Sequence, residues 1–254
     1  MRAAAFDSGV GGLSVVKSLA AHKLFDEIIY YGDTARAPYG AKDQNTIKRY
    51  SLEALEFLSG FEPDALIVAC NTASAYALDE LRSQAGFPVV GVIESGVLAL
   101  ENGGVGRGDR VLVIGTQATI GSGCYQNLLK ARGFENVTAL AAPLLVPLVE
   151  EGIFDGAIVD ETFKRYFGDL GDFDAVIMGC THYPLMQPAL GAWFKGAKLV
   201  HSGEAIVEYL KANNLVSDGA NDTQIQFFAS ENATRLKEVA SKWLDMPSLI
   251  KDKP

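Results

Sequence analysis

The chain has 254 residues, and its 31 acidic side chains outnumber its 22 basic ones, which gives a formal net charge of −9. Hydrophobic residues make up 48% and charged residues 21% of the chain, proportions typical of globular proteins and unlike those of disordered or collagen-like chains. The length suits one or two domains. The acidic balance argues against a surface that binds duplex nucleic acid, because such surfaces neutralise phosphates with clustered Lys and Arg.

Short apolar segments alternate with helix-length amphipathic segments along the chain. Most of the apolar segments are uninterrupted, as in parallel strands that are covered on both faces of a sheet. The alternation predicts an α/β fold with crossover connections. The predicted strands are Arg2–Phe6, Glu27–Tyr31, Ala65–Ala69, Val89–Ile93, Arg110–Ile114, Asn136–Leu140, Ala175–Met178, Lys198–Val200 and Gln224–Phe228. The predicted helices include Leu13–Ala21, Asp43–Ser59, Ala73–Gln84, Asp155–Phe167, Ala205–Ala212 and Glu231–Leu244.

We expect neither an export signal nor a membrane span. The apolar run at the N-terminus is broken by Asp7, which leaves it too short for a signal peptide. The uncharged stretches 111–129 and 175–194 are interrupted by glycines, prolines and polar residues, so each indicates a strand, a loop and a helix. The three cysteines, Cys70, Cys124 and Cys180, lack CxxC spacing. We therefore expect reduced thiols, a cytoplasmic location and no metal site.

The chain repeats a pattern after about one hundred residues. The segment ALIVACNTASA at Ala65–Ala75 aligns with AVIMGCTHYPL at Ala175–Leu185, and AAFDSGVGGLS at Ala4–Ser14 aligns with VIGTQATIGSG at Val113–Gly123. Two alignments at nearly the same shift indicate two similar α/β halves, although any two strand–loop–helix units resemble each other to some degree. The glycine-rich loop Glu101–Asp109 is the natural boundary between the halves. The residues leave open to which half the last strand and helix return.

The loops that follow the strands are the first candidates for a binding site, because ligands of open α/β sheets bind beyond the carboxyl ends of the strands. The first loop, Asp7–Gly12, is rich in glycine but lacks the last glycine of GxGxxG and the Lys of a phosphate-binding loop. It suits a small anion such as a carboxylate at a helix N-terminus, or a tight turn without a ligand.

Cys70 and Cys180 are the strongest chemical signal in these loops. Each directly follows a predicted strand at an equivalent place in the repeat, and each is followed by Thr with Asn or His rather than by apolar residues. A helix N-terminus lowers the pKa of a thiol, and the thiolate acts as a base or nucleophile. Two opposed groups that each give or take a proton suit inversion at a stereocentre. Cys124 lies inside a predicted helix, where we interpret it as a small hydrophobic residue.

Several segments together resemble the signature of the cofactor-independent glutamate racemase family. They are FDSGVGGLSV, YYGDTARAPYG, VACNTASA, GVIESG and GCTHYPLM, which lie in this order between residues 6 and 186. The segment HSGEAIVEYL at His201–Leu210 extends the resemblance towards the C-terminus. GCTHYPL is closer to the glutamate type than to the related aspartate racemases, which usually carry Glu after GCT. One departure is Ser95, where the family commonly has Pro.

The resemblance implies a fold of two pseudo-symmetric three-layer α/β domains with mainly parallel sheets and the active site between them. For this chain we expect residues 1–95 plus 210–254 to form the first domain, with Cys70, and residues 96–209 to form the second, with Cys180. The implied activity is racemisation of L-glutamate to D-glutamate for peptidoglycan, in a cytoplasmic homodimer that needs no cofactor or metal and binds neither nucleic acid nor membrane.

The resemblance also implies the roles of individual residues. Cys70 would exchange a proton with D-glutamate and Cys180 with L-glutamate. Asp7, His182 and Glu150 would assist the thiols, although the adjacent Glu151 competes with Glu150 for that role. The substrate-holding positions would be Asp7, Ser8, Tyr39, Gly40, Asn71, Thr72, Thr116, Thr119, Thr181 and His182.

Other classes of function remain open on the residues alone. One is a binding module with two lobes in which the thiols are incidental. The other is an aspartate racemase or a related isomerase or lyase that uses paired cysteines on a different acid.

Overall fold

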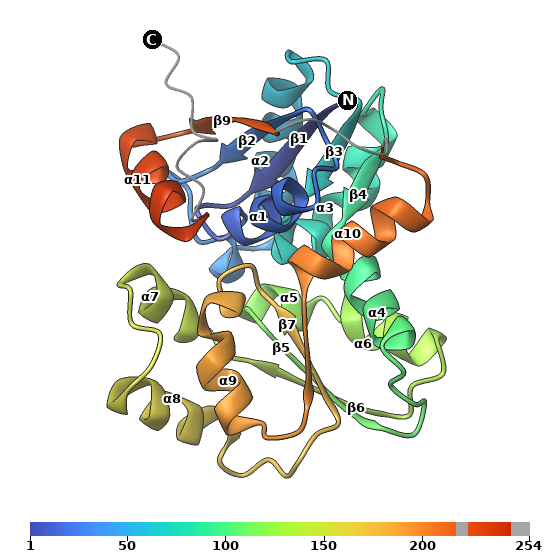
Figure 1. The fold of residues 1–254 in the computed structure, drawn as a ribbon, viewed down its shortest axis with the longest axis vertical. Helices are drawn as coiled ribbons and strands as arrows, with labels where there is room; N and C mark the ends of the chain where they lie inside the picture. Colours follow the sequence, from blue (N-terminus) through green and yellow to red (C-terminus); the bar gives the residue numbers. More distant parts are fainter. Residues whose placement is uncertain (217–222, 245–254) are drawn as a thin grey trace.

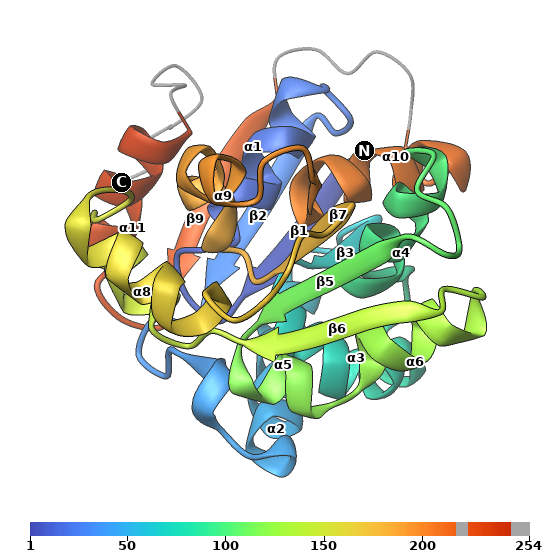
Figure 2. The ribbon, with the colours of Figure 1, turned by 90° about the horizontal axis from the view of Figure 1, so that it is seen from below.

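The computed structural model describes residues 1–216 and 223–244, which form two parallel sheets covered by helices on both faces (Figure 1). The first sheet has the strand order β4-β3-β1-β2-β9, and Figure 2 shows β9, β2, β1 and β3 in succession. Its strands are β1 (Arg2–Asp7), β2 (Glu27–Gly32), β3 (Ala65–Val68), β4 (Val89–Gly91) and β9 (Gln224–Ala229). The second sheet has the order β6-β5-β7-β8, with strands β5 (Arg110–Gly115), β6 (Asn136–Ala141), β7 (Ala175–Gly179) and β8 (Lys198–His201). Every described strand pair is parallel, so the predicted α/β class is confirmed.

The two halves share one strand order. In the first half β1 pairs with β2 and β3, and β3 pairs with β4. In the second half β5 pairs with β6 and β7, and β7 pairs with β8. The order β4-β3-β1-β2 therefore repeats as β8-β7-β5-β6, and β9 is an addition to the first sheet. The alignment of the two cysteine segments corresponds to the equivalent strands β3 and β7.

The six predicted helices are present, most with shifted ends. They are α1 (Leu13–Ala21), α2 (Gln44–Ser59), α3 (Asn71–Gln84), α8 (Ala157–Phe167), α10 (Ser202–Ala212) and α11 (Ala233–Trp243). Cys124 lies in a helix as predicted, at the first position of α6 (Cys124–Ala131). Helices that we did not predict are α4 (Val92–Asn102), α5 (Gln117–Gly121), α7 (Leu145–Glu150) and α9 (Gln187–Trp193), with the 3-10 turns η1 (Tyr39–Ala41) and η2 (Tyr183–Met186).

The predicted strand Val89–Ile93 was wrong at its end, because Val92 and Ile93 begin α4. Their apolar side chains fit a buried strand and a buried helix equally well. The backbone N–H of Val92 donates to Ser74 Oγ at 3.3 Å, and Glu94 lies in the first turn, where a negative charge favours a helix N-terminus. Ser95, the departure from the family pattern, is buried in that turn and donates to the carbonyl of Val92 at 3.0 Å.

Two helices cross between the halves and hold them together. Helix α4 follows the first sheet, but its Val97 and Leu100 pack in the core of the second sheet beside β5 and β7. Helix α10 follows the second sheet, but its Ile206 and Leu210 pack in the core of the first sheet beside α1. The two helices also pack against each other (Figure 1). The residue limits that we expect for the two domains stay a prediction.

The remaining helices cover the sheets in layers. Helices α1, α10 and α11 pack on one face of the first sheet, and α2 and α3 pack on the other. Helices α7, α8 and α9 cover one face of the second sheet, and α4 and α6 cover the other. The carboxyl ends of the strands in both sheets meet between the halves, which brings the post-strand loops together. No helix within residues 1–216 and 223–244 is long and apolar enough to cross a membrane.

Candidate active site

A small cavity lies between the two halves, at the carboxyl ends of the strands. Its volume is about 20 Å³, close to the space that one water molecule needs. It is lined by Ser8, Pro38, Tyr39, Gly40, Cys70, Asn71, Thr72, Thr116, Val146, Cys180, Thr181 and His182. Ten of these twelve are residues that the sequence analysis selected. The structure thus brings both thiols into one cavity, each from the equivalent strand of its half.

Cys70 is buried at the N-cap of α3. Its sulfur accepts a hydrogen bond from the backbone N–H of Ala73 at 3.5 Å and lies 3.5 Å from Ser8 Oγ. The helix N-terminus was expected to lower the pKa of this thiol. The opposite holds in the structure, because burial and the nearby negative charge of Asp7 raise the pKa of Cys70 to about 12 despite those hydrogen bonds. That expectation was wrong for this state, in which Cys70 is a neutral thiol and a proton donor.

Cys180 has a different environment. It lies after β7 but is followed by a turn and the short η2 rather than by an α-helix, so the expected helix N-terminus is absent there. Instead, Cys180 Sγ lies 3.8 Å from His182 Nδ1, and His182 Nε2 lies 3.2 Å from Glu150 Oε1. Of the two adjacent glutamates, Glu150 is therefore the one in contact with His182.

His182 is buried and held as a cation. Burial alone would lower its pKa, but the contacts with Cys180 and Glu150, with the negative charge of Asp7, outweigh burial and raise the pKa to about 10. The same contact with His182 lowers the pKa of Glu150, assisted by Arg235. A cation beside the sulfur stabilises negative charge on Cys180. The two thiols are thus in electrostatically opposite surroundings.

Asp7 is fully buried behind the cavity rather than in its lining. Its carboxylate accepts from the backbone N–H of Gly9 at 3.0 Å and from Thr181 Oγ1 at 3.2 Å. Burial raises the pKa of Asp7, while the positive charge of His182 and these hydrogen bonds oppose the rise. Through Thr181, this carboxylate from β1 in the first half is tied to the loop that carries Cys180 in the second.

Three threonine hydroxyls join the halves on the other side of the cavity. The Oγ1 atoms of Thr72, Thr116 and Thr119 lie 3.0 Å from one another. Thr72 belongs to α3 of the first half, and the other two belong to the loop after β5 and to α5. Thr72 and Thr116 line the cavity, whereas Thr119 acts through them. Thr116 Oγ1 also accepts from the backbone N–H of Thr119 at 3.1 Å. The hydroxyls of Thr72 and Thr116, which line the cavity, can donate to a carboxylate.

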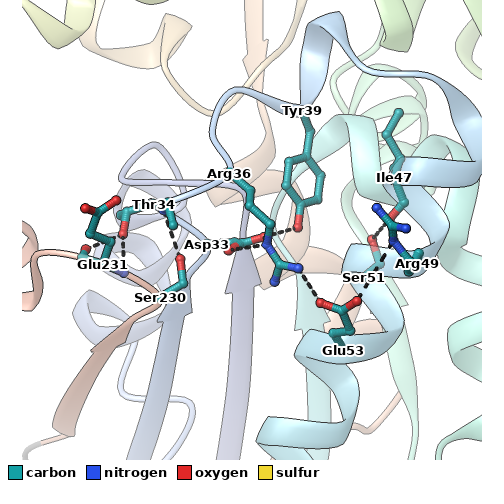
Figure 3. A network of polar contacts seen from close by, with 11 residues as sticks. Asp33, Thr34, Arg36, Tyr39, Ile47, Arg49, Ser51, Glu53, Ser230 and Glu231 are labelled. Carbon is teal, nitrogen blue, oxygen red and sulfur yellow. Dashed lines mark hydrogen bonds and ion pairs between the residues drawn. The ribbon is translucent and has the colours of Figure 1, made fainter.

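The loop that contributes Pro38, Tyr39 and Gly40 is anchored by a buried carboxylate (Figure 3). Asp33, directly after β2, accepts from Tyr39 Oη at 2.5 Å and pairs with Arg36 Nε at 2.7 Å. Arg36 also pairs with Glu53 on α2 and stacks over the ring of Tyr50, 4.1 Å from its centroid. Arg36 is therefore committed to this anchor, and no Lys or Arg lines the cavity.

The two halves are in van der Waals contact beside the thiols. A methyl group in place of the Gly11 hydrogen would lie 2.3 Å from Thr181 Oγ1 and 2.5 Å from His182 Nδ1. Ser14 Oγ, at the start of α1, donates to the carbonyl of Thr181 at 2.9 Å. A cavity of about 20 Å³ beside these contacts has no room for an amino acid.

The site agrees with three comparisons with known proteins. A family model described as Asp/Glu/Hydantoin racemase matches residues 13–210. The glutamate racemase of Nitratiruptor sp. is 58% identical over 245 residues, which are 96% of this chain and 96% of that protein. The crystal structure of glutamate racemase from Campylobacter jejuni has a TM-score of 0.95 at 50% identity, covering 99% of this chain and 100% of that one. A glutamate racemase from Francisella tularensis in complex with D-glutamate has a TM-score of 0.84 at 32% identity, covering 96% of this chain and 93% of that one.

The raised pKa of His182 predicts a particular dependence of stability on pH. The folded-state pKa of about 10 lies above that of an unfolded histidine, about 6.5, so the folded state binds more protons between these values. The contribution of His182 to the free energy of unfolding is complete below pH 6.5 and is lost as pH rises towards 10. In urea unfolding, the difference between wild type and His182→Asn should shrink across this range. Glu150→Gln removes one group that raises the pKa of His182, so in that variant the stabilisation by His182 should be lost at a lower pH. If the free energies of unfolding of wild type and His182→Asn depended on pH in the same way, the raised pKa of His182 would be contradicted.

Proposed function

The chain belongs to the Asp/Glu/hydantoin racemase family and is an isomerase, and from this premise we propose that it interconverts L- and D-glutamate by a two-base mechanism. The observation that carries the proposal is one small cavity between two equivalent halves, with Cys70 contributed by one half and Cys180 by the other. Two proton carriers on opposite sides of one carbon are what inversion of a stereocentre requires.

In the direction from L- to D-glutamate, the Cys180 thiolate removes the Cα proton and the Cys70 thiol delivers its own proton to the opposite face. Two features of the site without substrate support protonation states that suit this direction. Burial and Asp7 raise the pKa of Cys70, which keeps its proton available, and the cationic His182 stabilises negative charge on Cys180. In the reverse direction the protonation states are exchanged, with Cys70 as the base and Cys180 as the acid. After each turnover the two thiols have swapped states and re-equilibrate with solvent when the cavity opens.

Uncharged donors hold the two carboxylates of the substrate in this proposal. The cavity lining offers the hydroxyls of Ser8, Thr72, Thr116 and Thr181, with the side-chain amide of Asn71. Backbone N–H groups at the start of α3 add donors aimed at an anion. No Asp or Glu lines the cavity, so the substrate ammonium would pair with carboxylates just outside the lining, for which Asp7 and Glu150, in contact with Thr181 and His182, are the candidates.

A closed cavity also makes the difficult step possible. The Cα proton of an amino acid is far less acidic than a thiol, so the carbanion must be stabilised by fixed dipoles and kept from water. The hydroxyls, the helix N-terminus and the imidazolium supply that field without reorganising. Asp7 and Glu150 act on the thiols through Thr181 and His182 rather than by touching the reacting carbon.

The finer expectations from the resemblance belong to the same proposal. D-glutamate would supply peptidoglycan synthesis, and the protein would act in the cytoplasm as a homodimer. No group of three or more His, Cys, Asp or Glu side chains in the described part of the chain is arranged to hold a metal ion. The thiols, the hydroxyls and the helix terminus account for each step with no cofactor assigned.

A panel of substrates tests the proposal against its rival, a paired-cysteine enzyme for another acid. Purified protein treated with chelator should racemise L-glutamate and D-glutamate, followed by circular dichroism, and should act at least tenfold more slowly on aspartate, hydantoins and maleate. The cavity as it stands is too small to show which chain length of acid it selects. In this proposal, that selection is made when the two halves close around the substrate. Faster turnover of aspartate, or activity that disappears with chelator and returns with metal, would sink the proposal.

Single substitutions test the thiols. A serine hydroxyl is too weakly acidic to supply a base near neutral pH, although it can still donate a proton. Cys70→Ser and Cys180→Ser should each reduce racemisation by several orders of magnitude and leave the circular-dichroism spectrum of the protein unchanged. Because the two enantiomers are equally stable, kcat/KM must fall equally in both directions. Cys124 does not line the cavity, and its sulfur donates to the carbonyl of Ala75. Cys124→Ser is therefore the control and should retain nearly full activity.

A further inference from the structure

Tyr125 was not selected from the sequence, but it contacts Asn71, which follows Cys70, and the backbone of Gly179, which precedes Cys180. It lies on α6, is almost completely buried, and does not line the cavity itself. Its ring and its hydroxyl face different halves of the protein.

The hydroxyl of Tyr125 reaches the first half. It donates to Asn71 Oδ1 at 2.7 Å, and Asn71 directly follows Cys70 and lines the cavity. The amide nitrogen of Asn71 in turn donates to Ser202 Oγ, at the start of α10, at 3.3 Å. With its oxygen and one N–H occupied, the amide has its second N–H left to donate into the cavity.

The ring of Tyr125 rests against the second half. A methyl group at Gly179 would lie 3.1 Å from Tyr125 Cε2, so the ring packs directly on the backbone of the residue that precedes Cys180. A methyl group at Gly96 on α4 would lie 3.4 Å from the hydroxyl, which confines the phenol from a third side.

We propose that Tyr125 is a positioning residue for the racemisation. It fixes the position of Asn71 and the Cys70 loop relative to the end of β7, which Cys180 follows. The proposal rests on the proposed function, because it assigns the residue a role in that reaction. Tyr125 acts through Asn71, orienting the amide so that it donates to the substrate when the halves close.

The surroundings of the phenol suit this role. Burial raises the pKa of Tyr125, so the hydroxyl keeps its proton and donates a hydrogen bond to Asn71. Replacing the hydroxyl by hydrogen leaves the ring packing intact and removes only the link to Asn71, whose buried oxygen then lacks its partner.

A double-mutant cycle on kcat/KM tests the proposal. Tyr125→Phe should reduce kcat/KM for glutamate about tenfold, with a small change in the midpoint of thermal unfolding. In the background of Asn71→Ala, which is itself slower, the same change should alter kcat/KM less than twofold, because the group through which Tyr125 acts is gone.

Cys124→Ala is the matched control. Cys124 lies on α6 like Tyr125, and its replacement by alanine also removes a hydrogen bond to α3 of the first half, but to Ala75 instead of Asn71. It should keep kcat/KM within twofold of wild type. A Tyr125→Phe variant as active as wild type would overturn the proposal, and so would an equal loss in the Asn71→Ala background. Wild-type protein that does not racemise glutamate would instead contradict the proposed function, so the two failures are distinguishable.

Discussion

The proposed reaction depends on one constraint, which is that two sulfur atoms from different halves of the chain line the same small cavity. A single α/β sheet presents its loops from one side only, so two opposed groups need two sheets that face each other. The repeated strand order supplies two equivalent positions, after β3 and after β7, for Cys70 and Cys180. The exchange of α4 and α10 between the cores holds the two halves together.

The proposed site binds an anionic substrate with few charged side chains. A chain of net charge −9 is proposed to bind a substrate with two carboxylates, yet no Lys or Arg lines the cavity. Arg36, the one arginine in the nearby loops, is neutralised by Asp33 and Glu53. Hydroxyls and backbone N–H groups bind anions without attracting a fixed counter-ion. The remaining charges are divided between the thiols, with Asp7 raising the pKa of Cys70 and His182 lying beside Cys180.

The sequence predicted the parts of the fold that depend on local patterns. The predicted apolar segments located every strand in the described part of the chain, and long amphipathic segments located the six longer predicted helices. Helices of five to seven residues such as α5, α7 and α9 span too few turns to show a period, and Val92 and Ile93 suit a strand as well as α4. Within the site, the resemblance selected most residues of the lining. It did not select Tyr125 or Asp33, because their partners Asn71 and Tyr39 are joined to them only by the tertiary fold. The pKa of Cys70 was predicted in the wrong direction, because its helix position is local while burial and Asp7 are not.

Isotope exchange in heavy water tests the opposed thiols most directly. When L-glutamate is converted in heavy water and the reaction is stopped early, Cys70 carries deuterium from solvent and delivers it to the face opposite Cys180. The account predicts that the D-glutamate formed contains deuterium at Cα, while the remaining L-glutamate retains its original hydrogen. Deuterium that enters L-glutamate before D-glutamate accumulates would show that one group both removes and returns the proton, and would contradict the account even if both cysteines proved essential.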